Sequence, residues 1–154
     1  ALPICMAEMY LNLAEILIEL DALENTTGRL EEAKGLIDKI RVRAGIPTID
    51  EAWKKANHPE KANTAEGLRE IVRRERQIEF YLENQRFWDL RRWKDAGILG
   101  EKVWGMNIEG DTDETFFVPT ELQNIRTFKQ AQYLMPIPMT ETNKVPHIVQ
   151  NPGY

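Results

Sequence analysis

The chain has 154 residues, a length that suits one ordinary domain, and a net charge of −5, which argues weakly against a nucleic-acid partner. Hydrophobic residues make up 42% and charged residues 29%, as in a typical globular protein. A single cysteine, Cys5, excludes an internal disulfide, and no run of about 18 apolar residues could span a bilayer.

The first predicted helix runs from residue 4 to residue 23. Its apolar residues form two rows at steps of three and four, which leaves a narrow polar strip. The strip comprises Glu8, Asn12, Glu15 and Glu19. So narrow a strip predicts a helix that is buried on most sides. Because the chain enters this helix at once, we interpret it as a fragment of a longer protein, with Cys5 buried at the helix entry.

A second helix is predicted from residue 29 to residue 44, with apolar residues in a regular 3-4-3-4 pattern. Gly45 and Pro47 end it. Residues 1–45 therefore form an antiparallel hairpin that resembles a tetratricopeptide (TPR) unit, with the small residues Ala14 and Ala33 where the helices approach closely. One such hairpin cannot bury its own apolar face, so it needs neighbours.

Residues 46–63 form a polar connector with one short helix near residues 51–56. Thr64 is a good N-cap for a third helix. Asn84 can adopt the left-handed conformation that breaks this helix, and a fourth helix follows at residues 86–96, closed by Gly97. Residues 64–97 are therefore predicted to form a second helix pair.

Helical periodicity is lost in residues 98–154, which we expect to form an extended tail. Residues 115–118 and 126–128 are candidate short strands, and Pro136 and Pro138 exclude a helix from residues 133–138. Leu134 and Ile137 would be exposed if this segment did not pack across the helices. The predicted fold class is mostly α, with TPR-like antiparallel helix pairs and a long irregular, partly extended C-terminal tail.

The sequence offers no catalytic constellation. The two histidines, His58 and His147, lie in unrelated segments outside any zinc or di-iron pattern, and we expect both on the surface. Serine is absent, and no phosphate-binding glycine loop is present. We therefore predict no enzyme activity, no metal and no cofactor. A helical hydrolase that uses a pair of carboxylates is a weaker alternative.

Glu75 falls within the apolar stripe of the third helix, and a buried carboxylate needs a partner. We expect an arginine of residues 86–92 or a backbone donor to supply it. The predicted structural ion-pair cluster comprises Glu75, Arg86, Asp89 and Arg91. The acids and bases of residues 68–94 alternate at helical spacing, which favours internal pairing over a phosphate-binding surface.

Two tryptophans are weak candidates for ligand binding, since the sequence leaves the ligand-binding residues otherwise unknown. Trp53 and Trp104 lie in polar or irregular segments, where an exposed indole can stack on a sugar ring or a partner. Half-buried packing is the alternative interpretation for both.

Several segments together resemble the C-terminal region of the SusD/RagB family of outer-membrane nutrient-binding lipoproteins. They are AEMYLNLAE at 7–15, IRVRAGIP at 40–47, EIVRRERQIE at 70–79, RFWDLRRW at 86–93, YLMPIP at 133–138 and QNPGY at 150–154. Their order and spacing agree with the family across nearly the whole chain. The family usually has Glu-Gly where this chain has Glu83-Asn84, and Asn is the next best residue for that turn.

The resemblance implies a binding protein that is lipid-anchored on the outer face of the outer membrane through a missing N-terminal part. Such proteins capture glycans, or in some members peptides, and pass them to a SusC-like TonB-dependent transporter. The resemblance also implies that the glycan is bound mainly by that N-terminal part and that this segment does not insert into the membrane. A free TPR-like peptide-binding adaptor is the alternative, and it would not need the tail from residue 98 onward.

Overall fold

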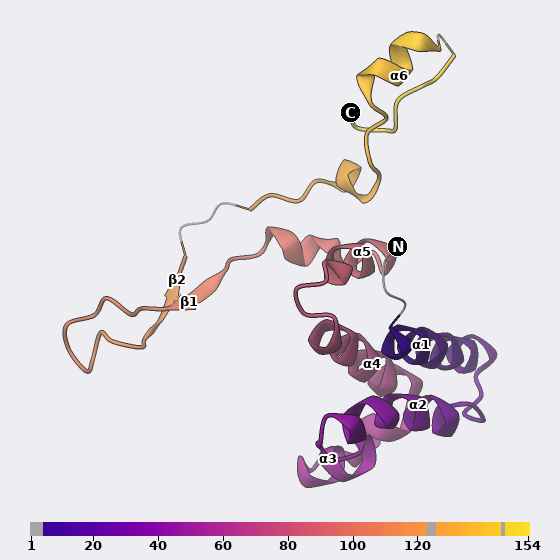
Figure 1. The fold of residues 1–154 in the computed structure, drawn as a ribbon, viewed down its shortest axis with the longest axis vertical. Coiled ribbons are helices and arrows are strands. Elements are labelled where there is room, and N and C mark those ends of the chain that lie inside the picture. Colours follow the sequence, from indigo (N-terminus) through magenta and orange to yellow (C-terminus); the bar gives the residue numbers. More distant parts are fainter. Residues whose placement is uncertain (1–4, 123–125, 146) are drawn as a thin grey trace. The chain divides into compact units, whose positions relative to one another are not determined.

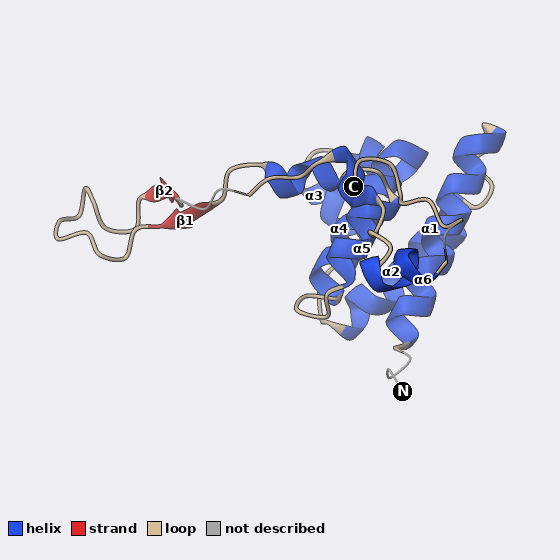
Figure 2. Ribbon diagram, turned by 90° about the horizontal axis from the view of Figure 1, so that it is seen from above, coloured by secondary structure: helices blue, strands red, loops and turns tan. Residues whose placement is uncertain are grey.

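The structure is a computed structural model that describes residues 5–122, 126–145 and 147–154. The chain divides into two compact units, Ala1–Arg86 and Phe87–Tyr154, and Figure 1 labels their elements. Within the described ranges, no helix combines the length and the apolar character needed to cross a bilayer. The fold is mostly helical, as Figure 2 shows, and this confirms the predicted fold class.

The first unit is built on helices α1 (Met6–Glu24), α2 (Leu30–Arg43) and α4 (Ala65–Glu79). Helices α1 and α2 pack as a hairpin, and α4 packs against both. Helix α3 (Ile49–Lys55) and a 3-10 turn (Pro59–Asn63) lie in the connection between α2 and α4. The fully buried residues of this core include Leu11, Ala14, Ile18, Ala33, Ile37, Leu68 and Val72. The two alanines leave room for α1 and α2 to approach closely, as the sequence predicts.

Among the described residues of the first unit, helix α1 packs against α2 and α4 and leaves its opposite side exposed, which corrects the prediction that it is buried on most sides. The opposite side carries an exposed apolar row, here called the α1 stripe, which comprises Met6, Met9, Leu13, Ile16, Leu20 and Leu23. Residues of the polar strip contact α4: Arg69 donates to both carboxylate oxygens of Glu19 at 2.6 and 2.7 Å, and Arg76 donates to Asn12 at 2.6 Å. A polar strip that pairs with a neighbouring helix has the same sequence pattern as a polar strip that faces solvent, so the sequence alone does not distinguish the two.

The turn between α1 and α2 is organised by the buried carboxylate of Asp21. It accepts hydrogen bonds from the Thr26 hydroxyl at 2.7 Å, the Arg29 backbone N–H at 2.7 Å and the Arg29 guanidinium at 2.9 Å. Burial raises the pKa of Asp21, but these hydrogen bonds lower it by more, so the pKa lies below its ordinary value of 3.8. The ionised carboxylate is therefore the form that the turn stabilises.

We expect Asp21→Asn to lower the melting temperature. The variant should also lose less stability than the wild type as the pH falls. A carboxylate with a lowered pKa stabilises the folded state above its ordinary pKa, and this contribution is lost as the pH falls through the folded pKa. Denaturant unfolding between about pH 2 and pH 7 measures the effect, since the ordinary pKa lies near 4. Glu24→Gln is the control, because Glu24 also contacts Arg29 but its side chain is 50% exposed. If the free energy of unfolding of Asp21→Asn depends on pH as that of the wild type does, the ionised Asp21 carboxylate does not stabilise the turn.

Helix boundaries in the first unit follow local backbone chemistry. Gly45 adopts a positive φ of 73° directly after α2, as its position predicts. Helix α3 begins at Ile49, two residues before the predicted start, because the Glu51 carboxylate accepts a hydrogen bond from the Thr48 backbone N–H at 3.1 Å. Asn84 adopts the predicted left-handed conformation, with a φ of 63°, before α5 (Gln85–Arg92), but α4 already ends at Glu79 and so is not broken by Asn84.

The boundary between the two units falls inside α5, and the second unit continues with shorter elements. These are a 3-10 turn (Ala96–Gly100), strands β1 (Trp104–Met106) and β2 (Pro119–Glu121), a second 3-10 turn (Gln130–Tyr133) and α6 (Met139–Lys144). The two strands pair antiparallel, with Gly105 opposite Thr120. The predicted strands at 115–118 and 126–128 are wrong, because residues 112–117 form a turn and residues 126–128 pair with no strand in the described ranges.

Helix α5 ends at Arg92, four residues before the predicted end, in a turn centred on Lys94. Lys94 adopts a left-handed φ of 63°, and the Asp95 N–H returns to the Leu90 carbonyl at 2.8 Å. This is the hydrogen bond of a Schellman motif, in which glycine is the usual left-handed residue. The Tyr133 hydroxyl stabilises the turn from the tail, since it donates to the Lys94 carbonyl at 2.6 Å and accepts from the Ala96 N–H at 3.1 Å.

Residues 134–138 are extended and are held by side chains of the chain end, whereas Tyr133, which the sequence also placed in this segment, closes the 3-10 turn before it. The Gln150 amide exchanges two hydrogen bonds with the Ile137 backbone, both at 2.8 Å. The Asn151 amide donates to the Met135 carbonyl at 2.6 Å, and the Tyr154 hydroxyl donates to the Leu134 carbonyl at 3.0 Å. Because two prolines prevent regular strand pairing here, polar side chains take the place of a neighbouring strand.

Candidate functional site

An exposed indole lies on the two-stranded sheet of the second unit. Trp104 is 62% exposed and stands directly opposite Glu121 in the antiparallel ladder. Side chains at such positions have Cβ atoms about 4.5–5.5 Å apart. The Lys102 ammonium lies 2.7 Å from the Glu121 carboxylate. This group of three residues, here called the Trp104 platform, places an exposed aromatic face beside two charged side chains.

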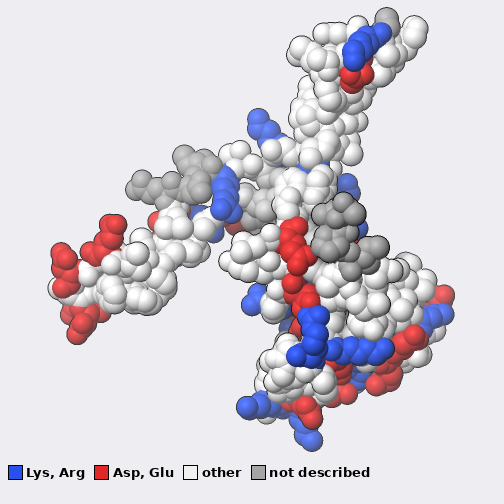
Figure 3. Space-filling model, in the orientation of Figure 1, with Lys and Arg blue, Asp and Glu red and all other residues white. Residues whose placement is uncertain are grey.

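The loop between β1 and β2 adds aromatic and acidic side chains to this surface. Phe116 and Phe117 are both exposed, and their rings meet edge to face with centroids 4.8 Å apart. Figure 3 shows acidic side chains gathered on the hairpin loop; in this segment they are Glu109, Asp111, Asp113 and Glu114, all exposed. Both phenylalanines lie in the predicted strand at 115–118 and were not among the residues that the sequence singles out. Two adjacent aromatics in an acidic loop were the available signal.

Trp53 has a different environment. It lies on α3, half-buried against the core of the first unit, and the Lys61 ammonium lies 5.3 Å from the centre of its ring. Trp53 and Trp104 belong to different units. Of the two candidates, only Trp104 presents most of its surface to solvent, so Trp104 is the stronger platform.

Glu75 is buried on α4, and its carboxylate pairs with the Arg41 guanidinium on α2. The sequence predicts an arginine of residues 86–92 or a backbone donor as the partner, and the structure corrects this to Arg41, because α2 packs against α4. One turn further along α4, Glu79 pairs with Arg43. These two ion pairs stabilise the helix packing, and they give no pair of carboxylates free for acid–base chemistry at this point.

The remaining members of the predicted ion-pair cluster lie on α5. Asp89 is buried and accepts a hydrogen bond from Arg92 at 2.9 Å. Arg91 is also buried, against two aromatic rings. Glu75 and Arg86 belong to the first unit, whereas Asp89 and Arg91 belong to the second. The grouping of all four in one cluster therefore stays a prediction.

Metal-ligating residues do not gather in the part of the chain that the structure describes: no group of three or more His, Cys, Asp and Glu residues is placed to hold an ion there. His58 is exposed and lies 3.0 Å from Glu60, and His147 is exposed. Cys5 is a half-buried free thiol before α1, less buried than the sequence predicts.

Known proteins match the chain over nearly its whole length. The model of the SusD family matches residues 4–154. The crystal structure of a SusD-like protein (BF3747) from Bacteroides fragilis NCTC 9343 is 36% identical with a TM-score of 0.74, over 96% of this chain and 25% of that one. Two structures of BT4246, one with selenomethionine, are 32% and 33% identical with TM-scores of 0.78 and 0.75, over 99% of this chain and 24% and 23% of theirs. No curated protein matches. The chain spans about a quarter of the length of these solved relatives.

Proposed function

The chain belongs to the SusD family, and from this premise we propose that it is the C-terminal part of a cell-surface glycan-binding protein. The observation that carries the proposal is a family match over residues 4–154, accompanied by the same fold at 36% identity. SusD proteins are a binding family, so the proposal includes no catalytic step.

In this proposal the complete protein captures oligosaccharides, or peptides, outside the cell and delivers them to a SusC-like TonB-dependent transporter. It is held on the outer face of the outer membrane by a lipid anchor on its N-terminal part. That part also makes most of the contacts to the glycan. The family resemblance supports each of these statements, and the Trp104 platform supports a secondary sugar contact from the second unit.

The α1 stripe supports the existence of a partner segment. Its exposed residues form one continuous apolar row along a helix of 19 residues. Large exposed apolar patches mark interaction surfaces in soluble proteins. Because the solved relatives are about four times as long as this chain, we propose that a helix from the rest of the polypeptide covers the stripe.

The ordered tail favours this function over that of a free TPR-like adaptor. An adaptor needs only the helix pairs, whereas here the chain end uses specific side-chain contacts to hold the extended segment. Gln150, Asn151 and Tyr154 each bind a backbone group of residues 134–137. Such contacts are expected where the segment has a role of its own.

The function is tested by growth of the host bacterium on glycans. Deleting the coding gene should slow growth on one polysaccharide or its oligosaccharides, and growth on the constituent monosaccharide should stay normal. The wild-type gene should restore growth when supplied in trans. Equal growth of the deletion strain and its parent on every glycan and peptide source tried would contradict the proposal.

The 154-residue chain alone should bind oligosaccharides with a Kd in the millimolar range or weaker. A single stacking contact of roughly 1 kcal/mol cannot offset the cost of immobilising a ligand. Calorimetric titration against an oligosaccharide panel measures this affinity, and Trp104→Ala should remove any residual binding. Trp53→Phe is the control and should leave it unchanged. Micromolar binding that survives Trp104→Ala would show that another surface carries the sugar.

A further inference from the structure

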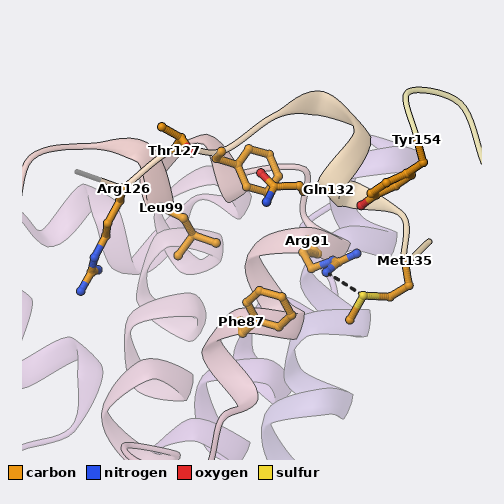
Figure 4. Close-up of a pocket in the computed structure, with 9 residues that line it drawn as sticks. Phe87, Arg91, Leu99, Arg126, Thr127, Gln132, Met135 and Tyr154 are labelled. Atoms are coloured by element: carbon orange, nitrogen blue, oxygen red, sulfur yellow. Dashed lines mark hydrogen bonds between the residues drawn. The ribbon is translucent and has the colours of Figure 1, made fainter. Parts of the chain in front are cut away.

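A cavity of about 500 Å³ lies in the second unit, between α5 and the tail (Figure 4). Its walls are mainly apolar and include Phe87, Leu99, Phe128 and Met135, with Tyr154 at one side. Small-molecule pockets typically have volumes of about 300–1,000 Å³ and mostly apolar walls with a few polar groups. The cavity therefore has the size and lining to hold a small organic group, and it shares no residue with the Trp104 platform.

Arg91 places a buried positive charge in the wall of this cavity. Its exposed fraction is only 9%. Its guanidinium donates to the Met135 sulfur at 3.6 Å, the contact drawn as a dashed line in Figure 4. It also lies 5.0 Å from the centre of the Phe87 ring and 5.5 Å from that of Trp88. Within the residues that the structure describes, none of these contacts is an anion.

These contacts give the guanidinium only weak partners. A thioether is a weak acceptor, and a guanidinium has five N–H donors in a planar fork. Aromatic rings attract the cation but accept no strong hydrogen bond. A buried charge normally has a paired anion, and the fork matches the two oxygens of a carboxylate. A carboxylate in this cavity would give Arg91 the strong acceptors that its present contacts lack.

The walls of the cavity are held in place before any ligand binds. The Tyr133 hydroxyl links the tail to the end of α5 through Lys94 and Ala96. The Phe128 and Tyr133 rings meet edge to face with centroids 4.9 Å apart, and Gly100 lies next to Phe128. A preformed site loses less conformational entropy on binding than one that must be ordered.

We propose that this cavity binds a carboxylate attached to an apolar or aromatic body. The carboxylate accepts two hydrogen bonds from Arg91 and displaces the Met135 sulfur, while the body packs against Phe87, Leu99 and Phe128. Arg126, which also lines the cavity and is exposed, adds a second positive charge at the edge. The carboxylate can come from a free organic acid or from an Asp or Glu side chain beside an aromatic residue in a peptide. This site is independent of the proposed glycan function.

The test is an NMR titration of the 154-residue chain with benzoate, and with benzamide as a neutral ligand of the same shape. We expect benzoate to shift the Arg91 Nε–H and Met135 methyl signals and to bind at least about tenfold more tightly than benzamide, a difference of about 1.4 kcal/mol. The blocked dipeptide N-acetyl-Phe-Asp-amide is titrated in parallel. Tighter binding of this peptide than of benzoate identifies a polypeptide carboxylate, and the reverse order identifies a free acid.

Variants separate the site from the general charge of the protein. Arg91→Gln should abolish benzoate binding, and Arg126→Gln should weaken it by less. Lys144→Gln, which removes an exposed charge on α6, should have no effect. Met135→Leu keeps the apolar wall but removes the sulfur acceptor, so benzoate should bind at least as tightly. Equal binding of benzoate and benzamide, absence of binding by both acids, or undiminished binding in Arg91→Gln would overturn the proposal. If Arg91→Gln does not fold, the proposal is still tested by the affinities of the wild-type chain for benzoate and benzamide and by benzoate binding to Met135→Leu.

Discussion

Replacing Glu75 by alanine should lower the free energy of unfolding by about 3–5 kcal/mol, because it leaves the Arg41 charge buried without its anion. The side chains of Arg41 and Glu75 are only 13% and 11% exposed. Arg41 also donates from its Nε to the Pro47 carbonyl at 2.7 Å. That carbonyl is a neutral acceptor, so it cannot balance the positive charge as the carboxylate does. Denaturant unfolding of the wild-type and variant chains measures the difference.

The same pair of helices provides a matched control for this prediction. Glu79 on α4 pairs with Arg43 on α2, but the Arg43 side chain is 58% exposed. Exposed ion pairs contribute roughly 0–1 kcal/mol, so Glu79→Ala should change the free energy of unfolding by no more than that. A double-mutant cycle of Arg41→Met and Glu75→Met isolates the pairwise energy. Equal effects of Glu75→Ala and Glu79→Ala would show that burial does not distinguish the two pairs.

The helices of this chain could be predicted from its sequence because their signals are local. The apolar periodicity of α2 lies within one helix, and the left-handed residues at Gly45 and Asn84 are of the types that this conformation favours. Lys94 adopts the same backbone conformation without being such a residue. Its turn depends on Tyr133, which is distant in the sequence, and no local pattern reveals that contact.

The partners of the buried charges could not be predicted, because they depend on which helices lie side by side. Glu75 meets Arg41, 34 positions earlier, and Glu19 meets Arg69, 50 positions later. A helical pattern identifies the face that a residue occupies but not the element opposite that face. The candidate site has the same limit: the sequence selects Trp104 as an aromatic in an irregular segment, and only the strand register places Glu121 across from it.

The long tail is expected to be essential for the solubility of the protein. Deleting residues 133–154 takes away the Tyr133 hydroxyl, so the Lys94 carbonyl and the Ala96 N–H lose the hydrogen bonds that stabilise the end of α5. It also removes the Met135 wall of the cavity and uncovers Phe87 and the buried Arg91. Newly exposed apolar surface of this kind promotes aggregation.

The truncated chain should therefore elute as soluble aggregates in size-exclusion chromatography with light scattering, and it should bind the dye ANS more strongly than the complete chain. Tyr133→Phe is the matched control, because it removes the hydroxyl and keeps the ring against Phe128. That variant should stay monomeric and lose about 1 kcal/mol of stability, the usual net contribution of a hydrogen bond. The two results together separate packing from hydrogen bonding: if the truncation stays monomeric with an unchanged melting temperature, the tail does not cover the apolar side of α5.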